Sequence, residues 1–168
     1  MMFLKQEKGV TLIELIISLM LAAIIGASAT GFMLHAMRTS NRIYTRHELL
    51  EHARIAMDTL TVHVLEAEQM QFQHNNRRLN LRIWYHPRDW RPPYLRTYTF
   101  EYLQHARRLN FGGNEVSLHL EELTMEVVDG LLEIYIRTAD NIGMGVYVEP
   151  ISLRRVVDVR FKKDWQND

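Results

Sequence analysis

The sequence predicts an α+β fold in which one long N-terminal helix precedes an antiparallel β-sheet. The helix is predicted because an apolar run near the N-terminus leads into a stretch, residues 32–72, without proline or glycine. The sheet is predicted because the rest of the chain alternates apolar and polar residues between proline and glycine turn signals. A length of 168 residues and a net charge of zero fit one domain with an appended helix, and no overall charge points to nucleic acid or an acidic surface.

The first part of the helix, residues 10–34, has the length and composition of a membrane span. Glu14 is its single ionisable residue. At 1.5 Å per residue the run forms a helix of roughly 37 Å, which exceeds the hydrocarbon thickness of about 30 Å. Basic residues flank both ends of the run, so the charge distribution does not fix its orientation.

The second part, residues 35–72, is expected to continue the helix with an amphipathic pattern. Apolar residues at helical spacing form one stripe, and polar groups occupy the opposite face. A stripe this narrow is typical of core packed against a sheet or another helix, and the seam is short for a coiled coil. The stripe comprises Ile43, Leu50, Ala53, Met57, Leu60, Val64 and Ala67.

Residues 73–168 are expected to form the antiparallel sheet, with five to seven strands. Asp129-Gly130 between two apolar segments is a strong hairpin signal, and Gly112-Gly113-Asn114 indicates another turn. The expected strands are 79–85, 94–102, 109–111, 116–120, 123–128, 131–137 and about 151–161.

Two residues at the N-terminus are unusual. Gly9 precedes the apolar run, whereas an ordinary secretory signal is cleaved beyond it, so cleavage after Gly9 would remove residues 1–9 and keep the membrane helix. Glu14 costs about 2.5–3.5 kcal/mol to insert into a membrane. It either reaches headgroup water or pairs with a positive group, and cleavage would create such a group as the α-amine of Val10.

The segment Lys8-Gly9-Val10-Thr11-Leu12-Ile13-Glu14-Leu15 resembles the processing motif of type IV prepilins and type II secretion pseudopilins. The resemblance implies that a prepilin peptidase cuts after Gly9 and methylates Val10, and that Glu14 assists entry into the filament. Two positions depart from the family pattern. Val10 stands where phenylalanine is commonest, which bears on methylation, and Gly31 stands where many major pilins have a helix-kinking proline.

The same resemblance implies the biology that we expect of the chain. It would be a pilin-like, single-pass protein of the inner (cytoplasmic) membrane, with its C-terminal domain outside the cytoplasm. It would join other pilins or pseudopilins, through the membrane assembly platform, in a hetero-oligomeric filament for secretion, DNA uptake or pilus biogenesis. Its role would be structural, with no catalysis and no cofactor.

A second resemblance covers the globular part. The helix segment 54–60, the segments 123–127 and 132–136 with their short turn, and a basic-apolar strand near 154–157 resemble J-type minor pseudopilins and pilus-tip minor pilins. This resemblance implies a minor subunit.

Catalytic and metal-binding motifs are not predicted. The chain has no cysteine, which removes thiolate ligands and nucleophiles. His47 and His52 superficially resemble a zinc-protease helix, but they are five residues apart, whereas zinc-binding histidines on one helix face are four apart. This spacing indicates that His47 with Glu51 is the only facing pair, and two ligands do not make a site. We therefore expect no metal.

Charge is distributed unevenly along the globular part. Residues 77–108 are rich in arginine and aromatic residues, and residues 115–133 carry six acids and no lysine or arginine. Three interpretations stay open: the two stretches pair within the domain, they dock between subunits, or the basic stretch binds nucleic acid, which we consider the weakest of the three. The candidate interaction surface comprises Arg77, Arg78, Arg82, Trp84, Arg88, Trp90, Arg91 and Arg96.

The alternative to a filament subunit is an uncut, single-pass membrane anchor that carries a binding domain outside the cytoplasm. Such a domain could contact DNA through residues 77–108. This alternative predicts that substitution of Gly9 has no effect.

Overall fold

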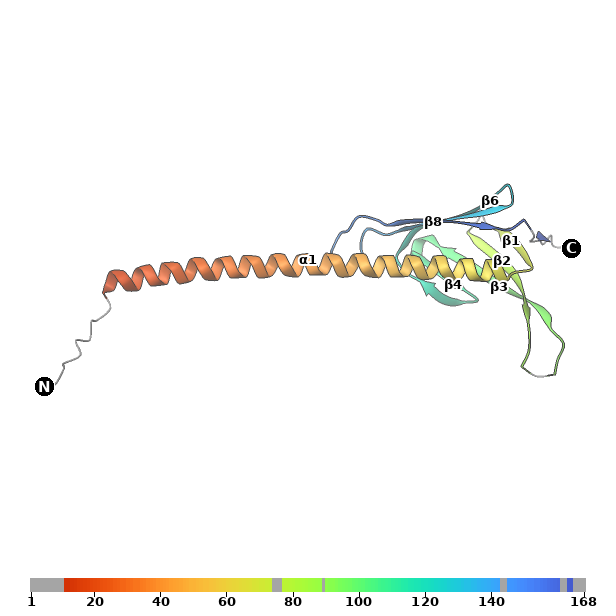
Figure 1. Ribbon diagram of the computed structural model, residues 1–168, viewed down its shortest axis with the longest axis horizontal. Helices are drawn as coiled ribbons and strands as arrows, with labels where there is room; N and C mark the ends of the chain where they lie inside the picture. The colour runs from red at the N-terminus through yellow and green to blue at the C-terminus, as the bar shows by residue number, and fades with distance from the viewer. Residues whose placement is uncertain (1–10, 74–76, 89, 143–144, 161–162, 165–168) are drawn as a thin grey trace. The chain divides into compact units, whose positions relative to one another are not determined.

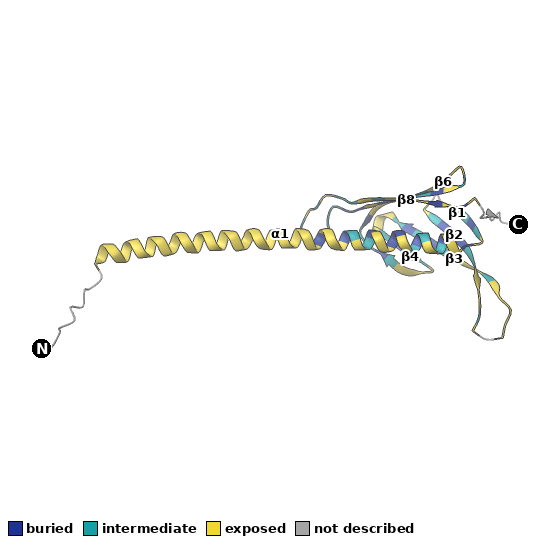
Figure 2. Ribbon diagram, in the orientation of Figure 1, coloured by how far each residue is buried: buried dark blue, intermediate teal, exposed yellow. Residues whose placement is uncertain are grey.

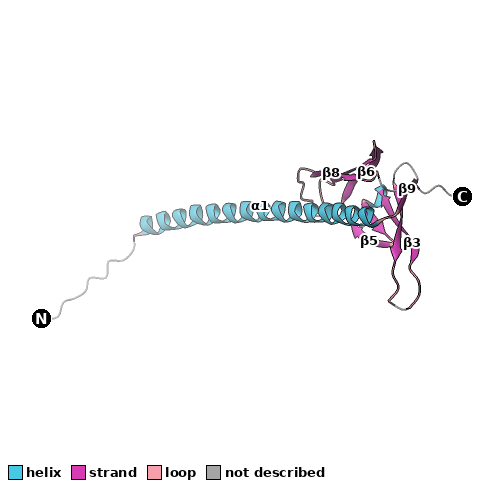
Figure 3. Ribbon diagram, turned by 45° about the vertical axis from the view of Figure 1, so that its right-hand side comes forward, coloured by secondary structure: helices cyan, strands magenta, loops and turns pink. Residues whose placement is uncertain are grey.

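The computed structural model describes residues 11–73, 77–88, 90–142, 145–160 and 163–164. They form one long helix followed by strands in two sheets, an α+β, pilin-like architecture (Figures 1 and 3). The helix α1 spans Leu12–Glu66. The strands are β1 Gln69–Gln73, β2 Arg78–Tyr85, β3 Tyr94–Leu103, β4 Arg108–Phe111, β5 Asn114–Ser117, β6 Leu120–Val128, β7 Leu131–Thr138, β8 Ser152–Asp158 and β9 Lys163–Asp164.

The start of α1 is capped by its own sequence. Thr11 precedes the first helical residue, and its Oγ1 accepts a hydrogen bond of 3.3 Å from the backbone N–H of Glu14. A threonine at this position satisfies a backbone donor that has no partner within the helix. Thr11 and Glu14 have the spacing of a capping box, with an acid in the first turn where the helix dipole favours negative charge.

The end of α1 lies at Glu66, whereas the sequence pattern predicted helix as far as Phe72. Residues Gln69–Gln73 instead form β1, which pairs antiparallel with β2. Met70 is buried opposite Leu81 in this pairing. The apolar residues that looked like a last helical turn therefore obtain their burial from strand pairing.

Exposure changes along α1 (Figure 2). Every residue from Thr11 to Tyr44 is exposed, including the apolar residues of the first half. From Thr45 onward one stripe is buried. Its buried members are Thr45, Leu49, Ala53, Ala56, Met57, Leu60 and Val64. The predicted stripe is thus confirmed from Ala53 to Ala67, whereas Ile43 is exposed and Leu50 half-buried.

The larger sheet has six strands in the order β5-β4-β3-β2-β1-β9. Its neighbouring strands are antiparallel except for β1 and β9, which are parallel. The strands β3 and β4 are joined by a short 3-10 turn, Gln104–Ala106, which ends at Arg107 in a left-handed conformation. The predicted turn at Gly112-Gly113 joins β4 to β5, and both glycines have positive φ.

The smaller sheet has three antiparallel strands in the order β6-β7-β8. Asp129 and Gly130 join β6 to β7 with φ values of 52° and 77°. Two consecutive positive φ angles are the signature of the hairpin turn that the Asp-Gly pair predicted. The predicted strand 116–120 differs from the structure, because β5 ends at Ser117 and β6 begins at Leu120.

The core lies where the second part of α1 packs on both sheets. Side chains from the helix, from β1 to β4 and from β6 to β8 form one cluster of buried apolar residues. Nine strands are seen in the described residues, compared with the five to seven expected. Two of them, β1 and the two-residue β9, lay outside every predicted strand.

Tyr102 links the two sheets. Its hydroxyl, on β3, lies 3.0 Å from the carbonyl oxygen of Leu120 and 2.6 Å from that of Glu121, both on β6, and its one proton is shared between these acceptors. Burial raises the pKa of Tyr102 to about 12. The hydroxyl therefore keeps its proton at neutral pH and remains a donor.

Substitution of Tyr102 by phenylalanine is predicted to lower the free energy of unfolding by about 1–3 kcal/mol, because the buried carbonyl of Leu120 and the part-buried carbonyl of Glu121 lose their shared donor. Denaturant titration of the full chain in detergent, followed by near-ultraviolet circular dichroism, measures the change. The exposed Tyr147 provides the control, and its change to phenylalanine should stay within about 0.5 kcal/mol. Equal effects of the two substitutions would contradict the linking role of Tyr102.

Candidate functional site

The N-terminal part of α1 is the first candidate site. Glu14 is exposed in the first turn of the helix, and the apolar residues that follow it are exposed as well. Gly9 and Val10 lie outside the described residues, immediately before Thr11 and the helix start. By length and composition, α1 is a candidate membrane span.

The second candidate is the Arg/aromatic segment, which forms β2, β3 and the hairpin between them. Its predicted residues do not gather at one place. Arg77 and Arg78 lie at the start of β2, and Tyr85 ends it. At the usual strand rise the two ends of β2 are about 23 Å apart. The predicted interaction surface is therefore divided between a strand-start end and a hairpin tip.

The strand-start end is largely paired within the sheet. Arg78 forms an ion pair with Glu101, the residue opposite it on β3. The guanidinium of Arg82 donates a 3.2 Å hydrogen bond to the side-chain oxygen of Gln69 on β1. These contacts favour the interpretation that this part of the basic stretch pairs inside the domain.

The hairpin tip is the more exposed part. Trp90 is 95% exposed and Trp84 49% exposed. Arg88 and Arg91 line a shallow hollow together with Tyr85, Pro87 and Tyr94. A flat indole ring that is almost fully exposed leaves apolar area available to a partner.

Arg96 lies between aromatic rings on the same hairpin. Its guanidinium carbon is 5.7 Å from the centre of the Tyr85 ring and 5.2 Å from that of Tyr98. Both distances are within the range of cation–π attraction. The rings of Tyr85 and Tyr94 are 5.4 Å apart across the two strands. These contacts order the strands that support the tip.

The acidic stretch 115–133 also pairs within the domain. Glu121 faces Arg137 at 3.6 Å, and Glu133 faces Arg154 at 2.6 Å. The partners of these two acids come from β7 and β8, outside the basic stretch. Glu115 does face a member of the basic stretch, Arg108, at 3.9 Å. Intradomain pairing thus accounts for three of the six acids.

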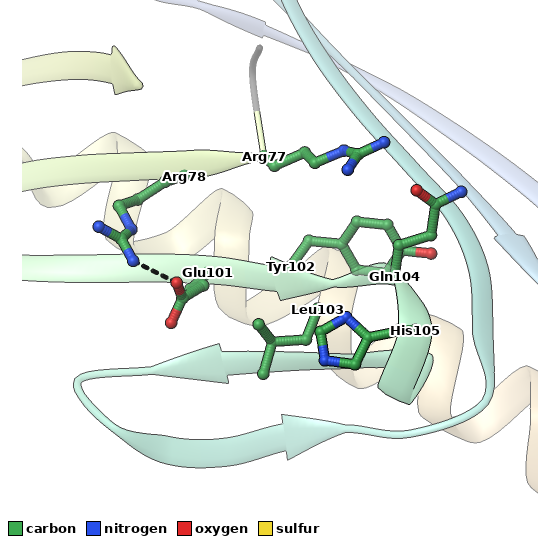
Figure 4. Close-up of a pocket in the computed structure, with 7 residues that line it drawn as sticks. All are labelled: Arg77, Arg78, Glu101, Tyr102, Leu103, Gln104 and His105. Carbon is green, nitrogen blue, oxygen red and sulfur yellow. Dashed lines mark hydrogen bonds and ion pairs between the residues drawn. The ribbon is translucent and has the colours of Figure 1, made fainter. Parts of the chain in front are cut away.

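A further hollow lies at the strand-start end (Figure 4). The side chains of Arg77, Glu101 and His105 contribute to its lining, together with Arg78, Tyr102, Leu103 and Gln104. Glu101 is paired with Arg78, as the dashed line in Figure 4 marks. Tyr102 holds its proton at neutral pH. Among these lining residues, no nucleophile is paired with a base, so the hollow has no arrangement suited to nucleophilic catalysis.

One cluster was missed by the sequence analysis. Glu48 and His52 lie one helical turn apart on α1, and His119 lies between β5 and β6. One ligand atom from each residue lies within 4.8 Å of the others. The prediction that His47 and Glu51 are the only facing pair was wrong, because Glu48 and His52 are also four residues apart on α1. His119 is 67 positions from His52, and no local pattern connects them.

His119 is half-buried, and its ring lies against the ring of His52. Burial lowers its pKa, and the neighbouring His52 lowers the pKa further. The rings of His52 and His119 meet edge to face, with centres 5.6 Å apart. At neutral pH, the imidazole of His119 is therefore biased toward its neutral form, which carries a free lone pair.

Comparison with known proteins bears on the N-terminal site. Residues 4–30 match the family described as the prokaryotic N-terminal methylation motif. This motif is the signal of type IV pilins and pseudopilins, and it indicates a substrate of that type. It implies processing by a prepilin peptidase and assembly with other pilins, and together with the apolar helix it is consistent with a membrane-anchored pilin. No curated protein and no solved structure matches the chain.

The exposure of the hairpin tip gives a prediction. Replacement of Trp90 by alanine should change the free energy of unfolding by no more than about 0.5 kcal/mol, because its side chain is almost fully exposed. Replacement of Leu81, which is fully buried on the same hairpin, by alanine should lower the free energy of unfolding by about 2–5 kcal/mol. Denaturant titration of both variants checks the pair. A large loss of stability in the Trp90 variant would show that the tip belongs to the core.

Proposed function

We propose that this protein is a minor pilin or pseudopilin. A prepilin peptidase removes residues 1–9, and the remaining chain is assembled into a type IV pilus-like or type II secretion pseudopilus filament. The function is structural and involves no catalysis. The observation that carries the proposal is the methylation motif at residues 4–30, which extends into the apolar helix that begins at Leu12 and whose apolar side chains are exposed.

The exposed apolar helix supports assembly. A soluble monomer rarely exposes so large an apolar surface, and lipid or neighbouring apolar helices would cover it. A membrane holds such a helix before assembly, and neighbouring subunits hold it afterwards. The small residues within the segment, among them Ala22, Ala23, Gly26 and Ala27, permit close approach of helices.

Glu14 has a role in this proposal that its position supports. It is a lone carboxylate in the first turn of an apolar helix, where its insertion is costly without a partner. Cleavage after Gly9 places the new α-amine of Val10 four residues before Glu14 in the sequence. The α-amine of a neighbouring subunit, methylated or not, supplies the Glu14 carboxylate with a positive partner. The hydrocarbon interior of the membrane supplies none.

The globular part contributes the contacts between subunits. The exposed tip of the β2–β3 hairpin, with Trp90, Arg88 and Arg91, is the surface we assign to docking. An exposed tryptophan flanked by arginines has the composition enriched in protein interfaces. For minor status, of the J type or at a pilus tip, we rely on the order of elements: the helix, the β6–β7 hairpin and then the basic strand β8 with Arg154 and Arg155.

Removal of the leader is the first test. In a membrane extract, the intact mass of the chain should fall by the mass of residues 1–9 when a prepilin peptidase is coexpressed, and Gly9→Ala should block this loss. Gly26→Ala is the matched control, since nothing lies within 4 Å of the added Cβ and processing should be unchanged. An additional methyl mass would assign the modification to Val10.

An uncut chain in the presence of an active peptidase would overturn the proposal. The protein would then be an anchored binding domain outside the cytoplasm, and DNA binding by residues 77–108 would become the hypothesis to test.

Glu14→Gln is predicted to separate processing from assembly. The variant should insert and be cleaved normally, because an amide is less costly than a carboxylate in the membrane. Its incorporation into filaments should fall by about 10- to 150-fold, corresponding to loss of a charge-assisted contact of about 1.5–3 kcal/mol. Quantitative immunoblotting of sheared filaments measures this, with Glu51→Gln, on the exposed part of α1 beyond the apolar run, as control. Normal incorporation of the Glu14 variant would remove the proposed role.

A further inference from the structure

The cluster of Glu48, His52 and His119 has no role in the proposed filament function. Two of its members come from α1 and the third from the segment between β5 and β6. We propose that these three side chains bind a divalent transition-metal ion of the zinc type. The proposal stands independently of processing and filament assembly.

The geometry brings three donors to one point. A ligand atom from each residue lies within 4.8 Å of the other two. A tetrahedral ion with bonds of about 2.0–2.2 Å needs its ligand atoms about 3.3–3.5 Å apart. The donor atoms therefore have to move toward one another by at most about 1.5 Å. Glu48 is exposed, so its side chain can make most of this movement without disturbing the core.

The segment that carries His119 is already fastened to the helix. The hydroxyl of Ser117 donates a 2.7 Å hydrogen bond to the backbone carbonyl of His52. The carbonyl of His119 accepts a 2.7 Å hydrogen bond from the N–H of Ala139. His119 itself has a φ of 61°, a conformation that non-glycine residues adopt rarely. The imidazole is thus positioned by backbone contacts before any ion binds.

The donor set selects the class of metal. Two imidazoles and one carboxylate are ligands that zinc uses with three protein side chains and one open position. Calcium and magnesium prefer sites made of oxygen atoms, so two nitrogen donors disfavour them. The sequence contains no cysteine, which excludes thiolate ligands from this chain. Copper(II) and nickel(II) accept the same donors.

One existing contact has to yield. The backbone N–H of Leu118 points to Nδ1 of His52 at 3.4 Å, which makes this nitrogen an acceptor. This distance is beyond the usual 2.7–3.2 Å of such hydrogen bonds, so the contact is weak. A small rotation of the His52 ring releases it and offers a lone pair to the ion.

Binding would connect α1 to the segment before β6. An ion that binds the folded chain and not the unfolded chain stabilises the fold according to its concentration and affinity. The fourth coordination position, which these three residues leave open, would hold water or a ligand from another molecule.

The test uses the full chain, purified in detergent with its leader, stripped with a chelator and then exposed to Zn²⁺ or Co²⁺ at pH 7.5. We expect about one equivalent of zinc per chain after gel filtration, and a visible absorption band of tetrahedral Co²⁺. Two variants preserve local structure while removing an imidazole. His119→Asn introduces asparagine, which tolerates positive φ. His52→Gln introduces a side-chain oxygen that can accept a hydrogen bond from the N–H of Leu118.

Both variants should lose retained zinc and the Co²⁺ band, and Glu48→Gln should weaken binding by at least about tenfold. His47→Ala is the matched control, because His47 is an exposed histidine on the same helix outside the cluster, and its binding should equal that of the unchanged chain. Near-ultraviolet circular dichroism verifies that each variant is folded. The proposal is overturned if the His52 and His119 variants retain as much zinc as the unchanged chain. It is also overturned if the unchanged, folded chain retains no zinc.

Discussion

The second part of α1 is the element on which the globular structure depends. One narrow stripe of this helix is fully buried, and both sheets place their apolar side chains against it. Ala53 and Ala56 have no exposed surface, and residues this small allow strands to approach the helix closely. Larger side chains at these positions would separate the sheets from the helix, since protein cores have little free volume to accommodate them. The sheets share one core because they share one helix face.

The same helix serves two different surroundings along its length. Its first part exposes apolar side chains, and its second part buries them in a stripe. Hydrogen bonds within the helix satisfy its backbone in either surrounding, which is the condition for crossing a membrane. The side chains alone therefore decide where each part is stable. The apolar run ends at Leu34, and burial begins at Thr45 within the same helix.

Features with a local cause were predictable from the sequence. The apolar run, the Asp129-Gly130 turn and the strand patterns of β2 and β3 each depend on neighbouring residues, and the helix, the turn and both strands were confirmed. The end of α1 was not predictable, because residues 69–73 become a strand only by pairing with β2.

The candidate sites divide in the same way. The N-terminal motif is contiguous and was recognised in the sequence. The basic and acidic stretches were interpreted as two blocks of charge. In the structure, ion pairs form between neighbouring strands instead, with Glu101 paired to Arg78 and Glu133 paired to Arg154. The approach of His119 to His52 depends on the whole fold and on a backbone conformation that composition does not signal.

The cap at Thr11 has a consequence for the proposed maturation of the chain. The hydroxyl that fixes the first turn belongs to the residue after Val10, so the proposed cleavage after Gly9 would leave this hydroxyl on the product. The hydrogen bond from the Glu14 N–H to Thr11 would then be available to the chain before and after signal removal, and the first turn would need no rebuilding.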